Sequence, residues 1–126
     1  MASKMAYDFV LDYLVSLNPK VKPMFGSHAV YVGEKIMLIT RDKETHEDDN
    51  GVWVATSKEH HESLKKDFPN IRTIHLLSSG KGETDWRNLP SSSPDFEEAV
   101  IRICELISKG DERIGRIPKP RAKKKS

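Results

Sequence analysis

The sequence predicts an α+β domain in which three helices pack against a mainly antiparallel sheet of four to five strands. The strongest indication is a hairpin at residues 28–40, where two segments rich in β-forming side chains are separated by Gly33-Glu34. A second is the helical spacing of apolar residues near both ends of the chain. A third is the length of 126 residues, which is typical of one domain with one core.

The N-terminal half reads as a helix, a loop and the hairpin. Ser3 is predicted to cap the helix, and Asn18-Pro19 to end it. A loop is expected before the hairpin, because Pro23 restricts the residue before it. The charged stretch after the hairpin contains no apolar side chain, which is typical of a solvated loop. The predicted order is a helix at 3–17, a loop at 21–26, strands at 28–32 and 35–40, and a solvated loop at 41–50.

The C-terminal half reads as strands and two further helices. Thr56 followed by Glu59 fits a capping box, and Ser93 followed by Pro94 is a favourable helix start. Residues 71–77 alternate as in a strand, but both sides of the strand are apolar. The predicted order is a strand at 52–55, a helix at 56–68, a strand at 71–77, a strand or irregular segment at 84–89, and a helix from 94 to about Gly110.

The charges divide the chain into an acidic body and a basic tail. Residues 113–126 contain seven basic and no acidic residues, whereas residues 1–112 contain 14 basic and 19 acidic ones. We therefore expect one domain at 1–112 and a disordered tail at 113–126. Binding of an anion such as a nucleic-acid backbone is expected of the tail, because the acidic body would repel it.

The composition also bears on the compartment. Cys104 is the only cysteine, so the chain has no internal disulfide and is expected in a reducing compartment. The N-terminal apolar stretch is interrupted by Asp8 and Asp12, unlike a signal peptide, and no stretch has the ~20 apolar residues of a membrane span. A cytoplasmic protein without membrane contact is the expectation.

No segment predicts a catalytic residue, a bound cofactor or a metal site. The acidic loop around His46 carries metal-ligand residue types, but the spacing matches no calcium loop and a solvated loop is favoured. Ser79-Gly-Lys-Gly82 lacks the spacing of a phosphate-binding loop, and Cys104 is read as a core thiol. An enzymatic alternative would need His28, Tyr31 and Trp86 to line one pocket.

The segment around Met24, Phe25 and Gly26 resembles the N-terminal domain of the TfoX/Sxy competence regulators. In that family a K-M-F-G-G segment precedes a short hairpin, as Met24-Phe25-Gly26 does here. The segment Thr84-Asp-Trp-Arg-Asn-Leu-Pro90 and the helix that follows it are similar to the end of that domain and of the related YjbR/MmcQ-like proteins. The resemblance covers most of residues 5–110. It implies a small bacterial α+β domain without enzymatic activity.

Two functional hypotheses follow. The first is a non-enzymatic module that contacts an unknown protein partner, with transcriptional regulation as the setting that the resemblance implies. The second is a weak nucleic-acid binder whose tail residues Arg121, Lys123, Lys124 and Lys125 neutralise phosphates. Exposed edge strands in so small a sheet also make a homodimer a possible arrangement.

Overall fold

The computed structural model describes residues 5–24, 26–77 and 84–117. They form a five-stranded antiparallel sheet with three α-helices, which confirms the predicted α+β class. The strands follow one another across the sheet in the order of the sequence. The strands are β1 (Lys20–Met24), β2 (Ser27–Val32), β3 (Lys35–Arg41), β4 (Gly51–Val54) and β5 (Arg87–Pro90). The helices are α1 (Val10–Tyr13), α2 (His61–Asp67) and α3 (Phe96–Ser108).

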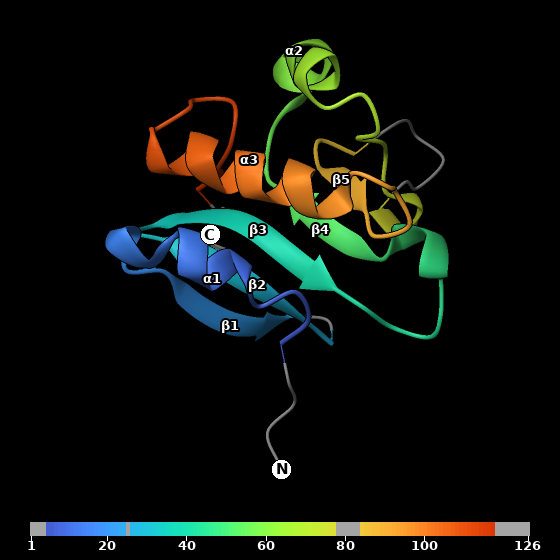
Figure 1. Ribbon diagram of the computed structural model, residues 1–126, viewed down its shortest axis with the longest axis horizontal. Coiled ribbons are helices and arrows are strands. Elements are labelled where there is room, and N and C mark those ends of the chain that lie inside the picture. Colours follow the sequence, from blue (N-terminus) through green and yellow to red (C-terminus); the bar gives the residue numbers. More distant parts are fainter. Residues whose placement is uncertain (1–4, 25, 78–83, 118–126) are drawn as a thin grey trace, which may run out of the picture.

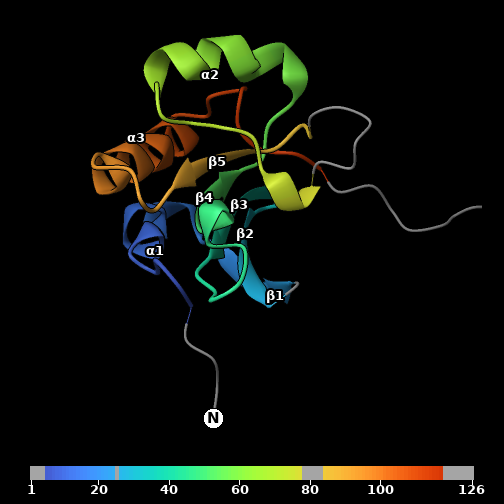
Figure 2. The ribbon, with the colours of Figure 1, turned by 90° about the vertical axis from the view of Figure 1, so that its right-hand side faces the viewer.

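The two faces of the sheet are covered differently. Helices α1 and α3 lie on one face, which we call the covered face, and α2 lies above the β5 end of the sheet (Figures 1 and 2). The main core lies between this face and the helices, as expected when a helix packs its apolar stripe against a sheet. Its largest fully buried side chains include Leu14, Leu38, Leu64, Phe68, Leu89 and Ile103.

The opposite face, which we call the open face, has a smaller apolar cluster. It is covered in part by the segment that contains Ile74 and the 3-10 turn His75–Leu77, which lies on the other side of the sheet from α1 and α3 (Figure 2). The buried members are Ala29, Ile36, Ile39, Trp53, Ala55 and Ile74, and partly buried Met24, Tyr31 and Trp86 pack against them.

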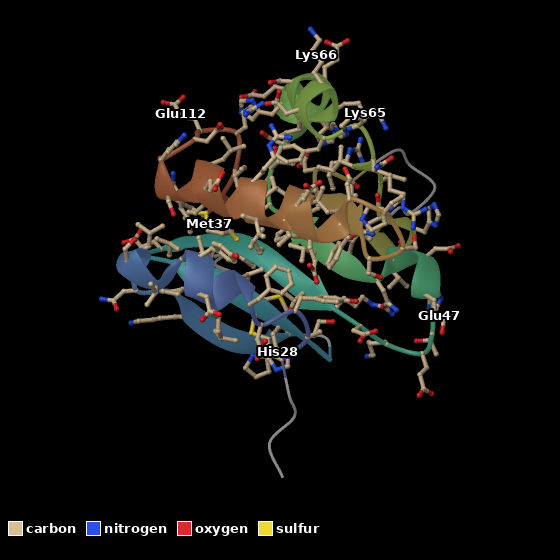
Figure 3. All side chains as sticks on the ribbon, in the orientation of Figure 1. His28, Met37, Glu47, Lys65, Lys66 and Glu112 are labelled. Carbon is tan, nitrogen blue, oxygen red and sulfur yellow. The ribbon has the colours of Figure 1, made fainter. Side chains whose placement is uncertain are left out.

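A bulge in β3 sets which side chains reach which face. Val30 pairs with Leu38 but Tyr31 pairs with Ile36, so Met37 is an extra residue in β3. Met37 and Leu38 therefore both belong to the main core, and Figure 3 shows Met37 between α3 and the sheet. The hairpin itself is confirmed, and Gly33 has the positive φ of 61° that its tight turn requires.

The N-terminal segment differs from its prediction. The helix expected at 3–17 is reduced to the single turn α1 and a 3-10 turn at Val15–Leu17, because Tyr7 has a positive φ that interrupts a helix. The Tyr7 ring instead packs edge-on against Phe96 of α3, with ring centroids 5.0 Å apart. The loop predicted at 21–26 is also wrong, since its first residues form β1 at the sheet edge, where proline is tolerated.

The charged segment at 41–50 is ordered around a buried guanidinium. Arg41 is 5% exposed and donates hydrogen bonds to the carbonyl of Thr45, the carbonyl of His46 and the side-chain oxygen of Asn50. These acceptors remove the cost of burying the cation. The prediction of a solvated loop is therefore wrong for the ends of this segment, because a polar network replaces the missing apolar core.

Two later predictions are wrong in part. The helix expected to start at Thr56 begins with a 3-10 turn at Lys58–His60 and continues as α2, and the Thr56 hydroxyl makes no capping hydrogen bond. The strand expected at 71–77 is reduced to one bridge, in which Arg72 and Asn88 exchange two backbone hydrogen bonds. This segment leaves the sheet after Arg72 because Ile74 turns onto the open face. The alternative of a last strand near 84–89 is confirmed by β5.

The domain extends past its predicted end. Ile114 is buried in the main core, and the backbone of Arg116 exchanges two hydrogen bonds with that of Ile36. The segment 113–117 thus fills the place beside β3 that β4 does not reach. The boundary at residue 112 is therefore wrong, and the remainder of the predicted tail, residues 118–126, lies outside the described residues.

The first two cations of the predicted tail are engaged within the domain. Arg113 makes ion pairs with Asp67 and Asp111, each at 2.9 Å, and lies between α2 and the turn after α3. Arg116 lies 3.3 Å from the carboxylate of Asp85 and donates a hydrogen bond to a backbone carbonyl. These two arginines therefore anchor the C-terminal segment, and the anion-binding hypothesis is reduced to the cations after residue 117.

None of the helices in the described ranges is long and apolar enough to cross a membrane.

Candidate functional site

An apolar hollow of about 320 Å³ lies on the open face, where β1, β3 and β4 meet the 3-10 turn at 75–77. Ile39 and Trp53 form its floor, and both are nearly buried. Leu76 and Leu77 form one wall and are 42% and 39% exposed, so two adjacent large apolar side chains meet solvent at the hollow. The full lining is Met24, Ser27, Ile39, Arg41, Lys43, Trp53, Leu76 and Leu77.

The leucine wall is held in place by one buried carboxylate. Asp49 is 1% exposed, and its two oxygens accept hydrogen bonds from the backbone N–H groups of His75 and Leu76 at 3.0 and 2.9 Å. These N–H groups open the short turn and would otherwise lack partners. The buried carboxylate of Asp49 thus fixes the backbone of the turn that carries the two exposed leucines. The hollow is therefore preformed, and the position of its wall does not depend on apolar packing of the leucine side chains.

The floor of the hollow is fixed in the same way. The indole N–H of Trp53 donates a 2.8 Å hydrogen bond to the carbonyl of Asp49, which settles the direction of the ring. Arg41 borders the hollow, but its guanidinium donates hydrogen bonds to the 45–50 segment. The guanidinium of Arg41 therefore holds the rim of the hollow in shape, and it is less available than Lys43 to pair with a charged ligand.

Lys43 supplies the available charge on the rim. Its amine has no carboxylate partner among the described residues, and it lies over Gly26, where a Cβ atom would collide with it. Gly26 has a positive φ of 77°, which is the reason that the turn favours glycine, since the flexible end of Lys43 could move aside from a Cβ atom. The rim of the hollow is therefore cationic.

A second, polar hollow of about 440 Å³ adjoins the first near the turn at Gly26 and shares Ser27 and Lys43 with it. Thr40 lines it, is fully buried and has a hydroxyl with no hydrogen-bond partner among the residues that the structure describes. The lining has one lysine and two carboxylates, so it is less suited than the first hollow to an acidic ligand. It is formed by Ala6, Gly26, Ser27, His28, Thr40, Asp42, Lys43, Glu44 and Thr45.

Only some of the site residues predicted from the sequence lie in the described part of the chain. Met24 and Gly26 of the family motif border the two hollows, and Phe25 lies outside the described residues. Arg121, Lys123, Lys124 and Lys125, the predicted nucleic-acid contacts, also lie outside them.

The residues of the enzymatic alternative do not converge. His28 and Tyr31 alternate to opposite faces of β2: His28 lines the polar hollow, whereas Tyr31, like Trp86, packs against the apolar cluster of the open face. Around His46, the described residues contain no group of three or more His, Cys, Asp or Glu side chains that could hold a metal ion. Asp49 of that loop serves the leucine wall instead.

Cys104 has the environment of a core thiol. It is fully buried in the main core, with its sulfur 4.0 Å from the carbonyl of Val10. Burial raises the pKa of the thiol to about 12, so it remains protonated and unreactive at neutral pH.

Comparisons with known proteins found no matching family model, no matching curated protein and no matching solved structure. The candidate site is therefore identified from the geometry of the folded chain alone. The sequence patterns did not predict its main residues. The sequence pattern predicts a strand for Leu76 and Leu77 and a solvated loop for Lys43. The signal that could have marked them is the pair of adjacent leucines directly before the serine- and glycine-rich segment that begins at Ser78.

Proposed function

We propose that this chain is a non-enzymatic protein-interaction module whose apolar hollow on the open face binds a short, acidic segment of a partner protein through its apolar side chains. The observation that carries the proposal is the pair of exposed leucines held at a preformed hollow with a cationic rim. Transcriptional regulation is the setting that the resemblance to TfoX/Sxy N-terminal domains supports.

The chemistry of the hollow favours this kind of partner. A hollow of about 320 Å³ accepts one or two apolar side chains, which supply affinity by leaving water. Lys43 beside it lacks a carboxylate partner among the described residues, and Lys20 and Lys22 of β1 add further cations on the same face. Acidic residues flanking the apolar anchor would therefore improve both encounter and register.

The neighbouring sheet edge is a less favourable site for a partner. β1 has no partner strand on its outer side in the described part of the chain. Pro23 cannot donate a backbone hydrogen bond, and the lysines at 20 and 22 disfavour a second strand, as in protected edges. The homodimer by edge pairing expected from the sequence is therefore not our proposal.

Fluorescence anisotropy with two labelled peptides tests the proposal. One peptide alternates leucine and phenylalanine with glutamate, and the other has lysine in place of each glutamate. We expect the acidic peptide to bind about tenfold or more tightly, since like charges meet in the basic complex. Equal affinity for the two peptides, or binding of neither, would contradict the proposal.

Matched variants locate the binding. Leu77→Ser removes part of the wall and is expected to weaken binding about tenfold, whereas Val15→Ser removes a more exposed apolar side chain elsewhere and leaves binding unchanged. Lys43→Glu reverses the rim charge, with Lys58→Glu, at an exposed position on the turn before α2, as its control. Equal effects of variant and control would reject the hollow as the site.

The nucleic-acid hypothesis remains an alternative that rests on the residues after 117. Its test is deletion of residues 118–126, because a chain cut at 112 would lose the buried Ile114 and the pairing of Arg116 with Ile36. Salt-sensitive binding that disappears on this deletion would favour the alternative.

A further inference from the structure

A basic hollow lies at the β5 edge of the sheet, away from the site described above. It has a volume of about 390 Å³ and is formed between α2 and the segment that bridges to β5. Three of its residues are permanent cations and one is a carboxylate. The lining is His61, Glu62, Lys65, Ile71, Arg72, Thr73 and Arg87.

Two cations in this hollow, Lys65 and Arg72, are fixed by hydrogen bonds to backbone groups. The amine of Lys65 donates a 3.1 Å hydrogen bond to the carbonyl of Ile71, which draws the end of the side chain across to the bridging segment. The Arg72 backbone exchanges hydrogen bonds of 2.9 and 2.7 Å with Asn88, and its guanidinium donates to the carbonyl of Asp48. Neutral carbonyls position both cations without cancelling their charge.

Two buried donors of residues that line the hollow have no hydrogen-bond partner within the described part of the chain. They are Nε of Arg72 and the hydroxyl of Thr73, neighbours in sequence whose side chains both line the hollow. A buried donor without an acceptor loses its hydrogen bonds to water and gains none in return, so such groups in a folded domain require an explanation. A ligand with several acceptor oxygens would satisfy both at once.

We infer that this hollow binds the phosphate group of a small phosphomonoester. Phosphate offers several acceptor oxygens and up to two negative charges, which fit a guanidinium N–H, a hydroxyl and an ammonium group. The volume admits the phosphate and part of the group that carries it. A long nucleic acid fits less well, because residues 1–112 carry 19 acidic against 14 basic side chains and would repel the flanking phosphates.

Adjacent residues of α2 provide a matched control. Lys65 and Lys66 are both exposed and equally charged, but only Lys65 lines the hollow. Figure 3 shows the two side chains leaving the helix in different directions, with Lys66 on its outer side. Thr73→Val is a second variant that removes the hydroxyl with little change in shape, and it reports on the site without altering charge.

The test is an NMR titration of the full-length ¹⁵N-labelled chain with inorganic phosphate, phenyl phosphate and a short single-stranded oligonucleotide, at constant ionic strength. We expect saturable shifts in residues 61–73 with phenyl phosphate, a dissociation constant about tenfold higher for Lys65→Gln and a smaller increase for Thr73→Val, and no change for Lys66→Gln. Inorganic phosphate is expected to shift the same residues.

Three results would overturn the inference. They are the absence of saturable shifts with both phosphate and phenyl phosphate, equal weakening by Lys65→Gln and Lys66→Gln, and shifts of residues 61–73 that only the oligonucleotide produces. The last would identify the hollow as a contact for a polynucleotide backbone.

Discussion

The two faces of the sheet differ in how their apolar side chains are covered. Leu38 and Ile39 are neighbours in β3 and point to opposite faces: Leu38 is fully buried under the helices, and Ile39 forms the floor of a hollow that opens to solvent. On the covered face, α1 and α3 pack directly on the strands. On the open face, a short turn held by the carboxylate of Asp49 takes their place.

This difference indicates a division of roles. Apolar packing on the covered face supplies most of the stability, because burial of aliphatic side chains is the dominant favourable term in folding. On the open face, polar contacts from buried groups fix apolar side chains in exposed positions. A surface of this kind costs stability in the free protein and is typical of a binding site.

The largest expected effect is a difference in unfolding free energy between two substitutions, one on each face of the sheet. Leu38→Ala should cost about 3 kcal/mol of unfolding free energy, because it leaves a closed cavity in the main core. Ile39→Ala should cost about half as much, since water from the hollow can enter the space. Urea denaturation measures both, and equal costs would contradict the division between the faces.

The next effect concerns the polar network that orders residues 41–50. Arg41→Met removes the donors to Thr45, His46 and Asn50 and should cost about 2 kcal/mol. Hydrogen exchange should accelerate in this segment and leave α3 protected. Unchanged exchange in the segment would show that the buried guanidinium does not organise it.

A smaller effect depends on pH. The hydrogen-bonded ion pair with Arg113 lowers the pKa of the Asp111 carboxyl below its usual range. A group whose pKa is lowered on folding stabilises the domain above its unfolded pKa, and this contribution is lost as the pH falls through the folded value. Asp111→Asn should therefore cost about 1 kcal/mol at neutral pH, with the difference shrinking below about pH 4.

Chemical denaturation of wild type and the Asp111→Asn variant across this pH range is the measurement. Glu112→Gln, at the exposed neighbouring position, is the control and should have little effect at any pH. A difference for Asp111→Asn that persists unchanged in acid would assign the loss to something other than its charge.

The smallest expected effect on stability is that of Leu77→Ser. The side chain is 39% exposed and lies outside both core clusters, so the unfolding free energy should change by less than about 0.5 kcal/mol. A loss of peptide binding with unchanged stability would sharpen the distinction between the faces. A loss of more than 1 kcal/mol would place Leu77 in the structural core instead.

Local patterns predicted the fold class, the hairpin and the last helix, because these depend on alternation, turn residues and helical spacing within short segments. β1 was missed because the pairing of residues 20–24 with β2 outweighs the local signal of Pro23.

The candidate site could not be predicted from local patterns. Its parts are the buried Asp49, the leucines at 76 and 77, and Lys43 over Gly26, which come together only in the folded chain. The charge count likewise assigned Arg113 to a tail, because a count cannot show that Asp67 lies within 2.9 Å of it.

The most direct test of the division between the faces is NMR mapping of the acidic peptide on the ¹⁵N-labelled chain. We predict that the shifts concentrate at residues 24, 27, 39, 43, 53, 76 and 77 around the apolar hollow, and that amides in α1 and α3 do not respond. Shifts concentrated in α1 or α3, with residues 76 and 77 unaffected, would contradict the account.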